Sequence, residues 1–347
     1  MIKYLGSKRA LVPALTKLAE ASGARTALDL FTGTTRVAQS LKRLGMTVTA
    51  NDLASYSYVM AKTWIELDSN SANLPELQGA IDRLNQLPGV PGYFTQTFCD
   101  ESRFFQPKNG AKVDAIRATI EADYRNCWLY YPLLTSLILA ADRVDSTTGQ
   151  QMAFLKNWAA RSFADLELRP VELLPGSGKA SQGDALEVAK QLPTCDLAYL
   201  DPPYNQHRYF ANYHIWETLV RGDEPDSYGI AKKRLDVRSE ATKSAYNSKR
   251  TMPNELKNLV RTVAADTLVL SYNNESWLDL DELIEICEQR GKVQVLQFDY
   301  RRYVGSKIGV YNKKGEVVGE PTHHRNIEYV VLAGTPTVVD RMVESLS

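Results

Sequence analysis

The sequence predicts an α/β fold with an open, mainly parallel sheet, a mainly helical insertion and a terminal antiparallel β-hairpin. Strand-like apolar runs alternate with helical runs over residues 26–50 and again after residue 178, and helical periodicity dominates the stretch between them. Two further apolar runs, Val293–Tyr300 and Ile327–Leu332, follow near the carboxyl end. Strands that alternate with helices are typical of parallel sheets, which supports this fold class.

The composition is that of a globular protein with segregated charge. Of 347 residues, 44% are hydrophobic, and 41 basic residues balance 41 acidic ones. This length allows one large domain or two ordinary ones. Residues 232–261 hold nine basic and three acidic side chains, whereas residues 263–290 hold one and seven. A local basic field attracts polyanions, so residues 232–261 fit a nucleic-acid face, with a solvated loop as the alternative.

The cysteines and the apolar runs bear on where the protein acts. The four cysteines are widely spaced, without a close pair of metal-ligand spacing. This spacing is typical of a reduced cytosolic protein without a disulfide framework or a zinc site. The N-terminus does not resemble a signal peptide, and no apolar run is long enough to span a bilayer. We therefore expect a soluble, cytoplasmic protein.

The first elements form a β-turn-α-β unit preceded by a helix. The predicted parts are the turn Gly6–Lys8, a helix Ala10–Ala21, a strand Thr26–Phe31, a turn Thr32–Thr35, a helix Arg36–Leu44 ended by Gly45, and a strand Met46–Ala50 followed by Asp52. A small-residue turn and an acid after the second strand are typical of nucleotide recognition. With Gly33 as its one glycine, the turn favours S-adenosylmethionine over a pyrophosphate-containing nicotinamide cofactor. Asp29 would then pair with the cationic amino-acid end of the cofactor; a purely structural cap is the alternative.

Residues 66–178 read as a helical insertion, with the strongest periodicity at Val113–Arg143. Its basic residues could contact phosphates or simply face solvent: Arg103, Lys108, Lys112, Arg117 and Arg125. The sheet pattern then resumes with a short strand ending at Asp184, a helix Ala185–Gln191 and a strand Asp196–Leu200.

The tetrapeptide Asp201–Tyr204 follows the last of these strands, and two rigid prolines end that strand abruptly. In open α/β sheets, ligands bind beyond the carboxyl ends of the strands. An acid and an aromatic ring there suit a flat nitrogenous base. The carboxylate of Asp201 and the carbonyl of Pro202 can accept hydrogen bonds from an exocyclic amine and localise its lone pair for attack on a methyl group. Stacking on Tyr204 would contribute about 1–3 kcal/mol.

Residues downstream of the tetrapeptide are aromatic and polar. His207 and His214 are interpreted as hydrogen-bonding loop residues rather than catalysts, and residues 228–253 as a mobile basic loop. A strand Thr267–Tyr272 and a helix Leu278–Gln289 follow. His323 and His324 are interpreted as surface residues in the excursion before the last strand.

Taken in order, these motifs resemble the D12 class of DNA adenine-N6 methyltransferases in the α arrangement. The family's Y-x-G-x-K motif is matched by Tyr4–Lys8, its D-x-F-x-G motif by Asp29–Gly33, and its D-P-P-Y motif by Asp201–Tyr204. Asp52 stands where the family has an acid after the second strand, and Asp184 where it has a loop acid before the catalytic strand. The chain departs from the commonest cofactor motif at residues 34–35, where two threonines replace a frequent glycine.

The resemblance implies a Rossmann-like S-adenosylmethionine-dependent methyltransferase sheet. Residues 1–66 and 179–347 would form the catalytic domain, and residues 67–178 a DNA target-recognition domain. The catalytic residues would be Asp201, Pro202, Pro203 and Tyr204. The cofactor site would be lined by Tyr4, Lys8, Asp29, Phe31, Gly33, Asp52, Leu53, Asp184 and Ala185, with Lys8 also near the target base.

The partner implied is double-stranded DNA with its target adenine flipped out of the duplex. We expect DNA contacts from Arg208, Tyr209, Lys232, Lys233, Arg234, Lys249 and Arg250. The resemblance also points to a nucleoid-associated monomer or weak dimer that works with a cognate restriction endonuclease. No metal is expected.

Several other functions share parts of this pattern. Some ribosomal-RNA adenine-N6 methyltransferases also use D-P-P-Y, but they tend to lack a long recognition insertion. An N4-cytosine enzyme more often has Ser before the two prolines. A nucleic-acid-binding module that has lost catalysis would not be expected to keep Asp201, both prolines and Tyr204 intact. The sequence therefore favours DNA adenine methylation.

Overall fold

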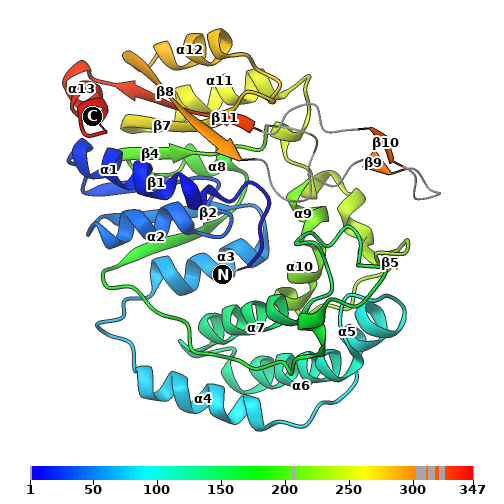
Figure 1. The fold of residues 1–347 in the computed structure, drawn as a ribbon. Helices are drawn as coiled ribbons and strands as arrows, with labels where there is room; N and C mark the ends of the chain where they lie inside the picture. Colours follow the sequence, from blue (N-terminus) through cyan, green and yellow to red (C-terminus); the bar gives the residue numbers. More distant parts are fainter. Residues whose placement is uncertain are drawn as a thin grey trace.

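A seven-stranded sheet forms the centre of the molecule, seen in a computed structural model that describes residues 2–204, 206, 208–301, 310–311, 317–319 and 325–346 (Figure 1). Its spatial order is β3 (Gly178–Gln182), β2 (Thr47–Asp52), β1 (Thr26–Asp29), β4 (Cys195–Leu200), β7 (Ala265–Asn273), β11 (Arg325–Gly334) and β8 (Lys292–Arg301). The first five strands are parallel, and β11 is antiparallel to both of its neighbours. This arrangement confirms the predicted Rossmann-like sheet and its terminal antiparallel pair.

The sheet is covered on both faces because the side chains of its strands alternate between two hydrophobic clusters. Ala27 and Leu197 belong to one cluster, whereas Leu28 and Ala198 belong to the other. Helices supply the outer layers. The first cluster includes residues of α1 (Val12–Ser22), α2 (Arg36–Arg43), α3 (Ser55–Ala61) and α13 (Pro336–Glu344), and the second includes residues of α8 (Ala185–Ala189), α11 (Met252–Thr262) and α12 (Leu280–Glu288).

The expected insertion is mainly helical, lies below the sheet in Figure 1, and contributes residues to the first cluster. Its helices are α4 (Leu74–Gln86), α5 (Tyr93–Thr95), α6 (Pro107–Tyr124) and α7 (Tyr130–Val144), with a π-helical turn at Gln96–Asp100 and a 3-10 turn at Ala160–Phe163. A further π-helical turn, Lys62–Glu66, precedes the insertion. Helices α9 (Tyr209–Asn212) and α10 (His214–Arg221) follow the D-P-P-Y segment, and α10 contacts both α3 and α7. The insertion therefore shares a hydrophobic core with the sheet.

Two sequence predictions need correction, and the predictions for three histidines fall outside the described residues. Residues 228–253 contain a short hairpin, β5 (Ser227–Tyr228) and β6 (Lys233–Arg234), then 3-10 turns at Leu235–Arg238, Glu240–Thr242 and Ala245–Asn247, instead of one long loop. His214 begins helix α10 and is fully buried, so its assignment to a loop was wrong. His207, His323 and His324 lie outside the described residues.

Two features are absent from the part of the chain that the structure describes. No helix there is long and apolar enough to cross a membrane. No group of three or more His, Cys, Asp or Glu side chains is placed to hold a metal ion.

Candidate active site

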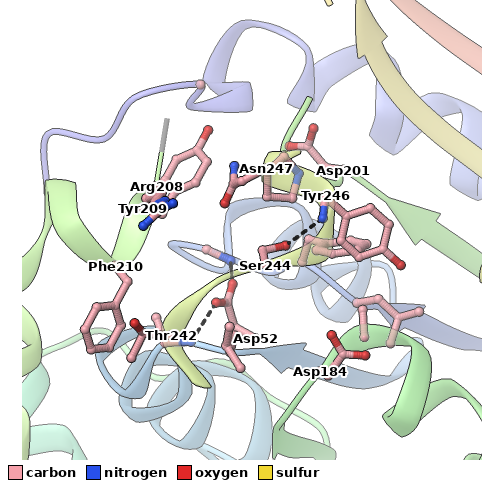
Figure 2. A pocket seen from close by; sticks show the side chains of 18 of the residues that line it. Asp52, Asp184, Asp201, Arg208, Tyr209, Phe210, Thr242, Ser244, Tyr246 and Asn247 are labelled. Carbon is pink, nitrogen blue, oxygen red and sulfur yellow. Dashed lines mark hydrogen bonds between the residues drawn. The ribbon is translucent and has the colours of Figure 1, made fainter. Parts of the chain in front are cut away.

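A pocket opens beyond the carboxyl ends of the parallel strands, as the position of the D-P-P-Y motif predicts (Figure 2). Its empty space is about 830 Å³, a volume that includes open solvent at its mouth. The predicted residues that line it are Tyr4, Phe31, Gly33, Asp52, Leu53, Asp184, Ala185, Asp201, Pro203, Arg208 and Tyr209. Residues from five separate stretches of the chain thus meet around one cavity.

A smaller pocket of about 330 Å³ adjoins the first, because both are lined by Tyr4, Gly33 and Asp201. Lys8 and Asp29 line only this second pocket. All nine predicted cofactor residues therefore lie around two adjoining pockets. Asp201 stands at their junction.

Asp29 ends strand β1 and is buried, with one carboxylate oxygen left without a partner. Oδ2 accepts a hydrogen bond from Oγ1 of Thr32 at 3.1 Å, while Oδ1 has no hydrogen-bond partner among the described residues. Burial raises the pKa of Asp29 to about 7, and the nearby carboxylates of Asp201 and Asp52 add to the rise. Burying an ionised carboxylate without a charge or hydrogen-bond partner costs free energy. A cationic ligand group at this oxygen would offset that free-energy cost.

The turn after β1 is fixed by Asp52, which ends the neighbouring strand β2. Its Oδ2 accepts from the backbone N–H of Gly33 at 2.8 Å, and its Oδ1 from that of Ala54 at 3.0 Å. Burial raises the pKa of Asp52 to about 6 despite these hydrogen bonds. Gly33 has a φ of +50°, and a Cβ there would lie 3.1 Å from the ring of Tyr4. Glycine is thus required at this position by both conformation and space.

The departure from the family's motif at residues 34–35 leaves a well-ordered turn. Thr35 takes the left-handed conformation with a φ of 61°, and its Oγ1 accepts a hydrogen bond from Nε2 of Gln39 at 2.8 Å. Both threonines are buried. A β-branched residue in this conformation is strained, so the hydrogen bond to Gln39 helps to hold the turn.

Tyr4 is the centre of an aromatic stack that forms one wall of the pocket. Its ring stacks on Tyr213 with centroids 4.7 Å apart and on Tyr209 at 5.3 Å. The sequence placed Tyr209 at the DNA; the structure places it against Tyr4, lining the pocket. The hydroxyl of Tyr213 also accepts from the backbone N–H of Leu5 at 2.6 Å, which fixes the N-terminal segment across the site.

Asp184 sits at the edge of the large pocket as the N-cap of helix α8. Its Oδ1 accepts from the backbone N–H groups of Leu186 at 3.0 Å and Glu187 at 3.3 Å. The next residue, Ala185, is buried. The capping role alone accounts for an acid here, while Asp184 remains exposed to the pocket.

The D-P-P-Y segment places its acid in the pocket and its tyrosine behind it. Asp201 Oδ1 lies 3.2 Å from Nζ of Lys8, and burial raises the pKa of Asp201 to about 6 although Lys8 opposes the rise. Pro203 lines the large pocket, whereas Pro202 and Tyr204 line neither. The Tyr204 ring is buried edge-to-face against Tyr272, with centroids 5.4 Å apart. In this arrangement its ring is not an exposed stacking platform.

Four pocket residues come from a segment that the sequence did not assign to the site. Thr242, Ser244, Tyr246 and Asn247 line the pocket opposite the strand ends (Figure 2). Tyr246 packs edge-to-face on Phe31 with centroids 5.2 Å apart, and its hydroxyl is buried without a partner among the described residues. The one sequence signal was an aromatic residue inside the basic stretch, because no strand or motif precedes it. Phe210 also lines the pocket unpredicted.

The predicted DNA-binding residues differ in how far their side chains are exposed to solvent. Arg234 is buried, and its guanidinium is bound to Asp223 at 2.6 and 2.7 Å and to Asp236, so it is not available to DNA. Its assignment as a DNA contact was therefore wrong: its charge is balanced inside the protein. Lys232 pairs with Glu101, and Lys233 is half-buried. Arg208, Lys249 and Arg250 are exposed.

Comparison with known proteins agrees with this geometry. A family model for the D12 class N6 adenine-specific DNA methyltransferases matches residues 4–286. The type II methyltransferase M.NlaIII of Neisseria lactamica is 32% identical over 93% of this chain and 98% of its own length. The modification methylase StsI of Streptococcus sanguinis is also 32% identical, over 88% of this chain but only 50% of its own length.

Solved structures show only a distant likeness. The methyltransferase domain of bacterial CtHen1 aligns over 94% of this chain and 98% of its own, at 11% identity and a TM-score of 0.32. The sheet order and the motifs therefore define the fold, and the family model and the curated relatives define the family. The chain belongs to the D12 class of N6 adenine-specific DNA methyltransferases, which use S-adenosylmethionine as cofactor.

Proposed function

We propose that the two adjoining pockets serve one reaction, the transfer of a methyl group from S-adenosylmethionine to N6 of a flipped adenine at a specific site in double-stranded DNA. The observation that carries this proposal is a pair of carboxylates, one buried and one half-buried, at the ends of adjacent strands. Asp29 ends β1 with an unpartnered oxygen, and Asp201 follows β4 at the junction of the pockets. One suits a cationic cofactor group and the other an amine.

The residues of the site fit the cofactor. The unpartnered oxygen of Asp29 would bind the amino group of its methionine part, Asp52 the ribose hydroxyls, and the apolar wall of Phe31 and Tyr246 its adenine ring. Tyr4, Leu53, Asp184 and Ala185 would line the same site. When bound, the cofactor supplies an electrophilic methyl group. The protein's part is to fix that group in line with the incoming amine.

Asp201 would act on the acceptor. Its carboxylate accepts one amine hydrogen bond and the Pro202 carbonyl the other, which localises the lone pair on N6. Tyr204 would serve the flipped base only if its ring moves away from Tyr272 when DNA binds. Base-modifying enzymes flip the target base out of the duplex, because a base that is paired and stacked is inaccessible to the active site.

DNA would bind on the side where the pocket opens. Arg208, Lys249 and Arg250 are the exposed basic residues predicted there, and residues 67–178 would supply the target-recognition domain. M.NlaIII is named as a type II methyltransferase and StsI as a modification methylase, which supports a role for this chain beside a cognate restriction endonuclease.

Methylation of defined DNA tests this function directly. Purified protein, S-adenosylmethionine and a plasmid are incubated, and the digested nucleosides are separated by mass. We expect N6-methyladenine, confined to one sequence context when the product is sequenced. N4-methylcytosine as the product, or methylation of RNA in preference to DNA, would contradict the proposal.

A further inference from the structure

A second buried carboxylate, Glu328, binds the same ammonium group as Asp201. Nζ of Lys8 lies 3.1 Å from Oε2 of Glu328 and 3.2 Å from Oδ1 of Asp201. Lys8 is only 6% exposed, and Glu328 is buried as well. Glu328 lies on β11, in register with Asn273 of β7. It therefore reaches the site from the antiparallel part of the sheet, outside the motifs that mark the rest of the site.

The charges of this group do not cancel. One ammonium and two carboxylates leave a net charge of about −1 when both acids are ionised. Lys8 paired with Asp201 alone would be neutral. Burial lowers the pKa of Lys8, but Asp201, Tyr204, Glu328 and Tyr199 together outweigh burial and hold that pKa well above its usual range, so the ammonium persists. The surplus negative charge is therefore supplied by Glu328.

That surplus matters because the acceptor becomes positive during the reaction. N6 forms a bond to the methyl carbon while the carbon–sulfur bond breaks and leaves its electron pair on sulfur. N6 then carries the positive charge until it loses one proton to water. Because Glu328 balances the charge of Lys8, the carboxylate of Asp201 keeps an uncompensated negative charge beside N6, which lowers the energy of this state more than that of the neutral amine.

Glu328 also gives Lys8 an alternative partner. Asp201 must offer oxygens to the amine, yet Lys8 occupies one of them in the absence of substrate. A buried ammonium cannot be left unpaired without a large cost. The contact with Glu328 allows Lys8 to stay paired while the carboxylate of Asp201 accepts a hydrogen bond from the amine of the base.

We propose that Glu328 is a positioning residue for methyl transfer, which holds Lys8 and carries its countercharge so that Asp201 keeps its own charge for the target amine. This inference rests on the proposed function, since the amine is that of the flipped adenine.

The test is the variant Glu328→Gln, which keeps the size and an acceptor oxygen but removes the charge. Lys8 still has Asp201 as its partner, so the fold is retained, as thermal unfolding will show. We expect kcat to fall roughly ten- to hundredfold, with KM for DNA and Kd for S-adenosylmethionine changed less than about threefold. Glu288→Gln, the same change at an exposed position on α12, is the control and leaves kcat unaltered.

The pH profile separates this role from a merely structural one. Burial raises the pKa of Asp201 and Glu328 raises it further, whereas Lys8 lowers it. Removing the Glu328 charge should therefore move the acid limb of kcat to lower pH even as its plateau falls. The other titratable groups coupled to Asp201 are unchanged in the variant: Asp29, Tyr199, Tyr204 and Tyr209.

A double-mutant cycle and a charge-retaining variant complete the test. In a Lys8→Gln background, Glu328→Gln should lower kcat little further, because Glu328 acts through Lys8. Glu328→Asp should keep the wild-type acid limb and exceed Glu328→Gln in kcat by at least about threefold. Additive losses, or equal rates for the Asp and Gln variants, would overturn the inference. A wild-type protein that does not methylate adenine would instead overturn the proposed function.

Discussion

At the scale of single residues, Asp29 carries a conflict between stability and binding. Its carboxylate is buried, one oxygen has no hydrogen-bond partner in the part of the chain that the structure describes, and burial raises its pKa to about 7. A raised carboxyl pKa means that its stabilising contribution is present below the unfolded value near pH 4 and is lost as the pH rises to about 7. The free protein therefore bears a cost at neutral pH that a cationic ligand group would offset.

The variant Asp29→Asn should separate these two effects. Without the charge, the free protein should unfold at a higher temperature at pH 8, while Kd for S-adenosylmethionine should rise roughly ten- to hundredfold, since a charge-assisted contact is worth about 1.5–3 kcal/mol. Calorimetric titration measures the affinity. In the wild type, affinity should weaken as the pH falls below about 7, because the carboxylate must lose its proton to bind the cation; the variant should lack this part of the pH dependence.

Asp196→Asn is the matched control, because Asp196 is a half-buried aspartate near the opposite end of β4, outside the residues that line the pockets. It binds the backbone N–H groups of Arg25 and Thr26, far along the strand from the pocket. It should leave the affinity for S-adenosylmethionine unchanged. Equal weakening in both variants would show that Asp29 does not contact the cofactor.

Sequence reasoning succeeded where a residue's place follows from the end of a strand. Asp29, Asp52 and Asp201 end or follow parallel strands, and such ends meet at one edge of a sheet whatever the loops do. It failed where the place depends on packing. Glu328 lies inside a strand that reads as an ordinary antiparallel one, and only the approach of β11 to the N-terminal segment brings it to Lys8.

At the scale of elements, residues 232–261 form several short structural elements with different roles. Arg234 anchors the β5–β6 hairpin through Asp223 and Asp236, and Tyr246 covers part of the pocket. The count of basic residues could not predict this division, because net charge does not reveal which cations are paired internally. Arg234 resembled Lys249 in sequence, yet only the latter is exposed.

The exposed pair Lys249 and Arg250 should carry the electrostatic contact with DNA in this stretch. Changing both to Gln should weaken DNA binding similarly for all sequences. It should also reduce the slope of log K against log salt by about 1.8, because two fewer counterions are released. Fluorescence anisotropy at several salt concentrations measures this slope.

Lys17→Gln combined with Arg43→Gln removes the same charge from exposed positions on α1 and α2. This control should leave the slope as in the wild type. If both double variants change it equally, the effect is one of net charge and the basic segment has no direct contact with DNA.

At the scale of the whole molecule, the insertion and the sheet share one hydrophobic cluster. Leu134 of α7 belongs to the same cluster as Leu15 of α1 and Val48 of β2. The change in periodicity predicted a helical insertion into the sheet domain, and the family resemblance implied that residues 67–178 form a target-recognition domain. Periodicity reports the local element and not what that element packs against, so the shared core could not be foreseen.

The shared core predicts a single cooperative unfolding transition. Leu134→Ala, at a fully buried position, should lower the free energy of unfolding by about 2–5 kcal/mol and shift the whole transition. Circular dichroism and calorimetry should report the same midpoint. Leu74→Ala, at a position 48% exposed on α4, is the control and should shift it little. A second transition that alone responds to Leu134→Ala would show that the insertion unfolds independently.

The most direct test of the account as a whole is methyl transfer by Asp201→Ala, measured beside the wild type on the same DNA with labelled S-adenosylmethionine. Lys8 keeps Glu328 as a partner in this variant, so the site should persist and the cofactor should bind with nearly unchanged affinity. We expect the rate of N6-methyladenine formation to fall by at least about 10²–10³-fold. Methylation at near wild-type rate by Asp201→Ala would contradict the mechanism.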